Sequence, residues 1–404
     1  MVVTWVTLSP VNGKAFIRYG PGAKFYEGKM ELFSYASKRE YSIGKITRYI
    51  YRATMNNLKI ACDYKYQIYS GEAYSEVFYF RTIKPNNSPA EFLVIGDMGN
   101  KQALSVKLLN EEIHNETFRY DMIVHVGDFA YNLEDDEGRV SDAYFQEIQS
   151  FAGFVPYQVC PGNHEKYENF SFYNNLFTMQ SLNHNVKPNE SPNINNFFWS
   201  YDIGPMHVIA FTTEFYYYTE YGTAQIHTQY QWLKEDLGKA IANRAKVPWI
   251  ITMAHRPMYD QSKKITDISN DFRVGSSSYP GLEKLFLDSG VDVSFWGHDH
   301  IYERTFPMYD MIVQNGTQEN PYENPNGIVH IITGSTGCYL HNPQLNPNPP
   351  AYSAMVNRDY SYTRVKVFNS THLRLQQVSQ DKGGAVIDEI MIVKNKHLPY
   401  KKPK

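Results

Sequence analysis

The first 83 residues alternate between apolar and polar positions in short runs, and Gly, Pro and Asn interrupt the runs. The clearest runs are residues 2–8 (VVTWVTL), 14–20 (KAFIRYG), 63–70 (DYKYQIYS) and 76–83 (EVFYFRTI). A period of two predicts strands that bury one face only, and no stretch here has convincing helical spacing. We therefore expect residues 1–84 to form a small all-β sandwich.

The pattern changes after residues 84–90 (KPNNSPA), where Pro, Asn and Ser break both helix and strand patterns and predict a domain linker. Apolar runs of strand length then alternate with amphipathic stretches of helical spacing. The runs, each ending in polar residues, are 92–97, 121–128, 156–163, 249–255 and 291–298, and the helical stretches are 105–115, 228–244 and 281–290. This alternation predicts a largely parallel sheet covered by helices.

The last part of the chain returns to consecutive strands. They are predicted in residues 327–334, 363–369, 371–379 and 385–393. These strands would complete a second sheet, so we expect residues 90–396 to form a two-sheet α/β sandwich.

Composition and charge argue against a nucleic-acid-binding or membrane-spanning protein. A chain of 404 residues, 42% hydrophobic and 20% charged, is long enough for two globular domains. The formal charge of −3 offers no basic surface for nucleic acid or an acidic membrane. No apolar run approaches the roughly 20 residues that cross a bilayer. Aromatic residues make up 15% of the chain, which fits a β-rich protein.

The three cysteines, Cys62, Cys160 and Cys338, are too few for a disulfide framework and lack CxxC spacing. A thiolate metal site is therefore not expected. Two alternatives stay open for Cys160 and Cys338: a disulfide in an oxidising compartment, or two buried thiols.

The residues that carry candidate chemistry follow five of the predicted strands. They are Asp97, Asp128, Tyr131, Asn163, His164, His255, His298 and His300. Strand ends of this kind meet at one edge of an α/β sheet. A set rich in oxygen and nitrogen, without sulfur, suits Fe, Zn or Mn and is large enough for two ions. A glycine directly before four of these residues lets the chain turn sharply off the strand.

Two details refine this site. His298 and His300, at positions i and i+2, are expected to point to one side of an extended segment and so to serve neighbouring ions. Gly99 follows Asp97 by two residues, and Tyr131 follows Asp128 by three.

Five motifs occur along the chain in the order GD, GDxxY, GNH[DE], a single His after a strand, and GHxH. This order resembles that of the purple acid phosphatases, which belong to the calcineurin-like metallophosphoesterases. The resemblance covers nearly the whole chain and includes HVGDFAYN, CPGNHE, ITMAHRPMY and HIITGSTGC. It is closest to the animal long-form, iron/zinc proteins. Ordinary members of the superfamily have DxH in the first motif; here Gly99 replaces that His, and the Tyr131 phenolate replaces the lost imidazole.

The resemblance implies an acid phosphatase that hydrolyses phosphate monoesters through a binuclear Fe(III)–M(II) centre and a metal-bound hydroxide, M being Zn, Fe or Mn. It also implies an N-terminal domain of fibronectin type III type, for which a truncated form is one alternative. Residue roles carry over as follows: Asp97, Tyr131 and His300 bind Fe(III); Asn163, His255 and His298 bind the divalent ion; Asp128 bridges them; His164 is the acid that protonates the leaving group.

One departure concerns the substrate phosphate. Large plant members carry further histidines shortly after the position of His255, whereas residues 256–275 contain none. We expect Arg256 and Tyr259 to contact phosphate instead, and Lys263 and Lys264 to be solvated.

Rival functions are a zinc or manganese phosphodiesterase or nucleotide phosphatase on the same fold, and a binding protein without turnover. Expected partners are small phosphate monoesters or phosphoproteins, and a second copy of the chain in a homodimer.

Location is predicted mainly from the resemblance, which favours a secreted or lysosomal protein. Six N-x-S/T sequons add mild support, at Asn86, Asn115, Asn169, Asn189, Asn315 and Asn369. The opening MVVTWVTL lacks the features of a signal peptide, which fits either a cytosolic protein or a mature or truncated form.

Overall fold

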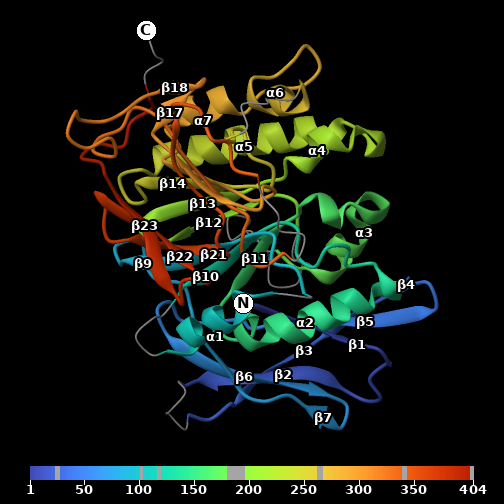
Figure 1. Ribbon diagram of the computed structural model, residues 1–404. Helices are drawn as coiled ribbons and strands as arrows, with labels where there is room; N and C mark the ends of the chain where they lie inside the picture. The colour runs from blue at the N-terminus through green and yellow to red at the C-terminus, as the bar shows by residue number, and fades with distance from the viewer. Residues whose placement is uncertain are drawn as a thin grey trace.

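A computed structural model of the chain describes residues 1–22, 28–100, 103–115, 120–179, 196–261, 267–338 and 344–400, with residues 267–269 described by their backbone alone (Figure 1). Lys263 and Lys264, which we expected to be solvated, and the sequon at Asn189 lie outside the described residues.

The N-terminal strands pair into two antiparallel sheets. The first has the order β1 (Val2–Thr7), β5 (Ile46–Thr54), β4 (Ser37–Ile43); the second has the order β3 (Leu32–Tyr35), β2 (Ala15–Pro21), β6 (Asp63–Ser70), β7 (Ala73–Tyr74), with β8 (Phe78–Arg81) also on β6. The period of two holds in β2, where Ile17 and Tyr19 are buried and Arg18 is exposed. The predicted all-β N-terminal domain is confirmed.

The first sheet of the larger part joins parallel and antiparallel strands. Its order is β11 (Tyr157–Cys160), β10 (Met122–Val126), β9 (Ala90–Ile95), β21 (Ser361–Val367), β22 (His372–Ser379), β23 (Ala385–Val393). Strands β9, β10 and β11 are parallel, and β21 returns antiparallel to β9. Residues 92–95 of β9 are completely buried, as expected for a central strand covered on both faces.

The second sheet has seven strands. Its order is β12 (Trp199–Ile203), β13 (Met206–Ala210), β14 (Trp249–Met253), β15 (Val293–Trp296), β19 (Val329–Thr333), β16 (Tyr302–Thr305), β20 (Ser353–Asn357). Strands β13, β14, β15 and β19 are parallel. The two sheets share one core, in which Phe92 of β9 meets Phe295 of β15 edge to face.

Helices cover the outer faces of the two sheets (Figure 1). Beside the first sheet lie α1 (Val106–His114), α2 (Arg139–Ala152) and α3 (Tyr167–Leu176); beside the second lie α4 (Glu214–Tyr217), α5 (Ala224–Ala242), α6 (Asp267–Arg273) and α7 (Glu283–Ser289). Shorter elements are the 3-10 turns η1 (Asp136–Gly138), η2 (Asn163–Glu165) and η3 (Thr219–Tyr221) and the hairpin β17 (Met308–Tyr309), β18 (Ile312–Val313). The predicted two-sheet α/β sandwich is confirmed.

The N-terminal strands dock against α2 and α3 of the larger part. The Tyr41 hydroxyl lies 2.9 Å from Ser171 Oγ on α3, and Arg48 of β5 pairs with Asp142 on α2. The N-terminal strands therefore lie against the two helices that follow the loops after β10 and β11.

Candidate metal centre

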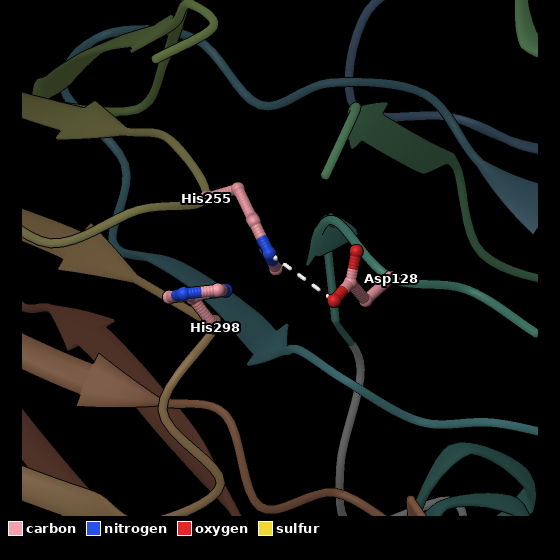
Figure 2. Close-up of side chains that lie close together, drawn as sticks. All are labelled: Asp128, His255 and His298. Atoms are coloured by element: carbon pink, nitrogen blue, oxygen red, sulfur yellow. Dashed lines mark ion pairs between the residues drawn. The ribbon is translucent and has the colours of Figure 1, made fainter. Parts of the chain in front are cut away.

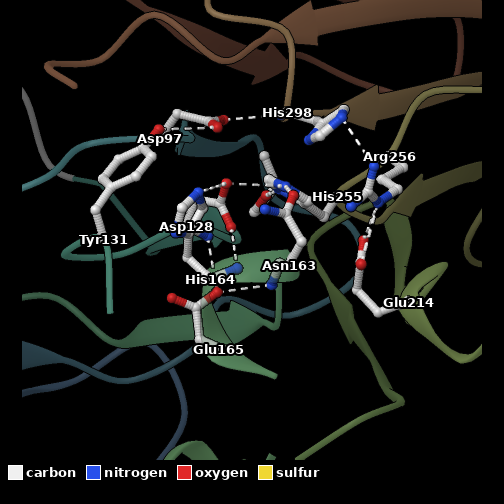
Figure 3. Close-up of polar contacts among 12 residues, drawn as sticks. Asp97, Asp128, Tyr131, Asn163, His164, Glu165, Glu214, His255, Arg256 and His298 are labelled. Carbon is white, nitrogen blue, oxygen red and sulfur yellow. Dashed lines mark hydrogen bonds and ion pairs between the residues drawn. The ribbon is translucent and has the colours of Figure 1, made fainter. Parts of the chain in front are cut away.

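The carboxyl ends of five parallel strands converge where the two sheets meet (Figure 3). Asp97, Asp128 and Asn163 follow β9, β10 and β11, and His255 and His298 follow β14 and β15. Contacts across the sheets join the two groups: the His298 amide donates to Asp97 Oδ2 at 2.9 Å, and His255 Nε2 lies 3.3 Å from Asp128 Oδ2.

Two glycines make this close approach sterically feasible. Gly127 has φ +88°, and a Cβ there would lie 2.5 Å from His255 Nδ1. A Cβ on Gly162 would lie 2.2 Å from Asp128 Oδ1. Any side chain at either position would displace a candidate ligand, which accounts for glycine in the GD and GNH motifs.

One cluster gathers around Asp128, His255 and His298 (Figure 2). One ligand atom from each of the three lies within 4.8 Å of the others, which is close enough to share an ion. The His255 Nδ1–H donates to the Val126 carbonyl at 2.8 Å, so that Nε2 is free to face Asp128. Asn163 Oδ1 lies 3.2 Å from the same Nε2 and adds a fourth donor.

A second cluster contains Asp97, Tyr131 and His300. The Tyr131 hydroxyl lies 2.7 Å from His300 Nε2 and 3.3 Å from Asp97 Oδ1, and His300 Nε2 lies 3.4 Å from that same oxygen. The structure therefore brings together all seven residues that the sequence suggested as ligands, in two adjoining groups.

Four of these residues have left-handed backbones: φ is 56° at Asp97, 54° at Asp128, 56° at Tyr131 and 70° at His298. Each such residue costs of order 1–3 kcal/mol unless it is glycine. The expectation that His298 and His300 lie on an extended segment is wrong, because a left-handed residue turns the chain directly after β15. Both side chains nevertheless reach the clusters.

Burial disfavours the charged forms of the acids in this site. Burial raises the pKa of Asp97, and it raises the pKa of the Tyr131 hydroxyl well above its usual value, with Asp97 and Asp128 adding to the shift. Burial alone would lower the pKa of His255, but Asp128 outweighs it and raises the pKa to about 10. Bound cations would favour the charged form of these acids. The oxygen and nitrogen donors fit such cations.

His164 lies beside the clusters and is held by a different contact. Its Nδ1 lies 2.9 Å from Asn132 Oδ1, and because an amide oxygen only accepts, Nδ1 carries the proton. Its Nε2 lies 4.0 Å from Asp128 Oδ2 and its side chain is 29% exposed. His164 is thus oriented by Asn132, a residue to which sequence reasoning gave no role.

Three parts of the chain match known families. Residues 90–302 match the calcineurin-like phosphoesterases, residues 327–389 the iron/zinc purple acid phosphatase-like protein C domain, and residues 1–82 the purple acid phosphatase N-terminal domain. Acid phosphatase type 7 of Danio rerio is 42% identical over 417 residues, which cover 99% of this chain and 89% of that protein. The chain belongs to the purple acid phosphatase family.

Other members of the purple acid phosphatase family agree with this assignment. Acid phosphatase type 7 of Mus musculus is 38% identical over 402 residues, 98% of this chain and 88% of that protein. The structure of purple acid phosphatase PPD1 from yellow lupin (Lupinus luteus) seeds has a TM-score of 0.74 at 21% identity and covers 97% of this chain and 72% of that one, which shows a shared fold. Membership implies a binuclear metal centre and phosphate monoester hydrolysis, and it does not favour the phosphodiesterase or binding-protein alternatives.

Arg256 reaches the purple acid phosphatase centre, as the sequence suggested. Its Nη1 lies 2.9 Å from His298 Nε2, and its Nε donates to both oxygens of Glu214 at 3.0 and 3.1 Å (Figure 3). The guanidinium also lies 4.2 Å from the ring centre of Tyr217. Glu214, which is fully buried, therefore fixes Arg256, and no motif in the sequence indicated it.

Tyr259 is not brought to the centre. It is buried, and its hydroxyl donates to Glu283 while Arg273 donates to that hydroxyl at 3.2 Å. The side chain thus belongs to the core that covers the second sheet, and we leave it out of the substrate contacts.

Glu165, the last residue of the family's GNH[DE] motif, has a role that sequence reasoning missed. Its carboxylate accepts the backbone amides of Asp128, Phe129 and Gly162 at 2.9, 2.9 and 2.8 Å. It therefore ties the loop after β10 to the loop after β11.

The two cysteines near the motifs, Cys160 and Cys338, are both buried, and neither forms a disulfide in the described part of the chain. Of the two alternatives that the sequence left open, the structure has the pair of thiols.

Proposed function

We propose that this chain is an acid phosphatase that hydrolyses phosphate monoesters at an Fe(III)–M(II) centre. The observation that carries the proposal is the closeness of two donor clusters, which are joined where the His298 amide donates to Asp97 Oδ2 at 2.9 Å. Two bound ions supply positive charge for the phosphate oxygens and lower the pKa of a coordinated water.

The donor sets support a division of ligands. Asp97, Tyr131 and His300 would hold Fe(III), and Asn163, His255 and His298 would hold the divalent ion. Asp128 would serve both; its Oδ1 accepts the His164 amide at 3.0 Å and its Oδ2 lies 3.3 Å from His255 Nε2.

The neighbourhood of Gly99 supports iron at the first site. A Cβ on Gly99 would lie 3.7 Å from Cδ2 of Tyr131, so the phenol ring fills the space beside the position where related enzymes carry a histidine. Phenolate is a hard anionic donor, and hard donors suit a trivalent ion.

His164 and Arg256 would act on the substrate. The Nδ1–H of His164 is hydrogen-bonded to Asn132 Oδ1. His164 would therefore present its Nε2–H to the leaving oxygen and donate that proton there. Arg256, held by Glu214, would bind a phosphate oxygen through its guanidinium and so orient the ester.

Tyr131→Phe tests the iron assignment. The wild-type protein with its native metals should absorb broadly in the visible, since phenolate-to-Fe(III) charge transfer produces such a band, and the variant should lose it. Metal analysis, visible spectra and p-nitrophenyl phosphate hydrolysis would be measured together.

Tyr362→Phe is the matched control, because the Tyr362 hydroxyl is buried without a hydrogen-bond partner and its loss should leave the band intact. A colourless, fully active wild type containing two zinc ions would contradict the iron assignment.

We also propose that the protein is secreted or lysosomal and glycosylated. Among the described sequons, Asn115, Asn169, Asn315 and Asn369 are exposed and Asn86 is half-buried. None of the helices in the described ranges is both long and apolar enough to span a bilayer. A loss of mass after N-glycosidase treatment of protein made in a secretory cell would support this location, and an unchanged mass would oppose it.

A further inference from the structure

Arg48, on strand β5 of the N-terminal sandwich, is completely buried against the larger part of the chain. Its Nε and Nη2 donate to the two carboxylate oxygens of Asp142 on α2, each at 2.8 Å. Its Nη1 donates to the Glu137 carbonyl at 2.9 Å. The two contacts with Asp142 hold the first turn of α2, and the contact with Glu137 reaches the segment between β10 and α2.

That segment, residues 131–138, is here called the tyrosine loop. Five of its residues have left-handed backbones, with φ between 52° and 82°: Tyr131, Asn132, Asp136, Glu137 and Gly138. Four of these five carry a Cβ, so this conformation costs free energy and persists only where surrounding contacts enforce it.

The start of the tyrosine loop belongs to the candidate metal centre. The Tyr131 hydroxyl contacts His300 and Asp97, and Asn132 Oδ1 accepts the Nδ1 proton of His164. Backbone hydrogen bonds connect this start to the end of the loop: the Asp135 amide donates to Asn132 at 3.1 Å, and the Gly138 amide donates to Glu134 at 2.9 Å.

The end of the tyrosine loop is held by the N-terminal sandwich. Besides Arg48, the Lys45 amide donates to Glu137 Oε1 at 2.9 Å. The fit is tight at Gly138, where φ is +82° and a Cβ would lie 2.6 Å from the Arg48 guanidinium. Only glycine can stand at this position while Arg48 keeps its contacts.

We propose that Arg48 is a positioning residue for the metal centre. By holding the end of the tyrosine loop, it keeps Tyr131 and Asn132, and through Asn132 also His164, in the orientation that the chemistry needs. The N-terminal sandwich thereby takes part in building the active site. The consequence for catalysis rests on the proposed function; the hold on the loop does not.

The test compares Arg48→Met, which keeps the aliphatic stem and removes the guanidinium, with Arg52→Met. Arg52 lies four residues along the same strand and also crosses to the larger part. Its side chain donates to Thr178 Oγ1 and to the Asn175 carbonyl, both at 2.5 Å, at a place in the described structure away from the tyrosine loop. Arg52→Met therefore controls for a general weakening of the contact between the two parts.

Hydrogen exchange of residues 131–138 is the first readout, measured on metal-free and metal-loaded protein. Arg48→Met should exchange about ten-fold faster there, because the Glu137 carbonyl and the adjoining Asp142 lose their donors and local opening becomes easier. Arg52→Met should exchange at the wild-type rate in this loop. Arg48→Lys keeps the charge but loses the forked geometry, so its exchange rate in the loop should lie between those of wild type and Arg48→Met. If Arg48→Met does not fold, Arg48→Lys takes its place in the comparison.

The second readout is kinetic. Arg48→Met should lower kcat more on alkyl phosphates than on p-nitrophenyl phosphate, because a misplaced His164 matters most for a poor leaving group. The inference is overturned if both Arg48 variants exchange like wild type, if Arg52→Met accelerates the loop equally, or if the loop opens while the two substrates are affected alike. A colourless wild type with the same exchange pattern would instead refute the iron assignment and leave the hold on the loop standing.

Discussion

Asp128→Asn is expected to abolish most phosphatase activity and to leave the protein short of metal. Asp128 Oδ1 accepts the His164 amide at 3.0 Å, while Oδ2 lies 3.3 Å from His255 Nε2. In the variant the amide oxygen would keep the contact with His164, and the NH2 group, which cannot ligate, would point at the ions. Losing the shared charge should cost roughly 10³-fold in rate, since metal-ion stabilisation of phosphoryl transfer is worth several kcal/mol.

Asn163→Asp is the matched comparison for this change. It keeps an oxygen donor and affects one of the proposed sites, so it should retain more metal than Asp128→Asn. Metal content by mass spectrometry and hydrolysis of p-nitrophenyl phosphate would be measured on both. If the two variants hold equal amounts of metal, Asp128 does not bridge.

His164→Ala is expected to keep both metals and the visible band while losing about 10²–10⁴-fold in kcat on alkyl phosphates, the range typical of a general acid. The structure supports a role outside the ligand set, because Nδ1 is held by Asn132 and Nε2 lies 4.0 Å from Asp128 Oδ2. An alkoxide leaves slowly without a proton, whereas p-nitrophenolate needs little help. The loss on p-nitrophenyl phosphate should therefore be clearly smaller.

Two results would change the assignment of His164. An equal loss on both substrates with metals intact would mean that it binds phosphate and does not donate the proton. Loss of a metal would make it a ligand. Asn132→Ala, which removes the acceptor that orients the imidazole, should reproduce the substrate pattern of His164→Ala with a smaller amplitude and unchanged metal content.

The sequence by itself determined the fold and the convergence of the candidate ligands. Asp97, Asp128 and Asn163 each stand two residues or more past a buried apolar run, directly after a glycine, and His255 and His298 follow two further runs. The ends of parallel strands meet at one edge, so side chains attached there converge whatever the loops do. Local patterning was sufficient because each ligand is positioned by its own strand.

Side-chain direction beyond the strand ends was decided by the tertiary structure. Arg256 and Tyr259 share one short motif, yet the first is turned to His298 and the second to Glu283. The backbone bends after β14, and the two side chains, three positions apart, reach different partners. The left-handed backbone of His298, which replaced the expected extended segment, has the same origin: it depends on contacts with Asp97 on the other sheet.

The residues that hold the site residues in place could not be predicted from the sequence either. Glu214 holds Arg256 from 42 positions away, and Arg48 reaches Asp142 across 94 positions. Neither belongs to a periodic pattern or a motif, because a buried charge needs only one partner in space and places no constraint on its neighbours in the chain. Which residues pair depends on how the two sheets and the N-terminal sandwich pack together, so the packed structure decides their identity.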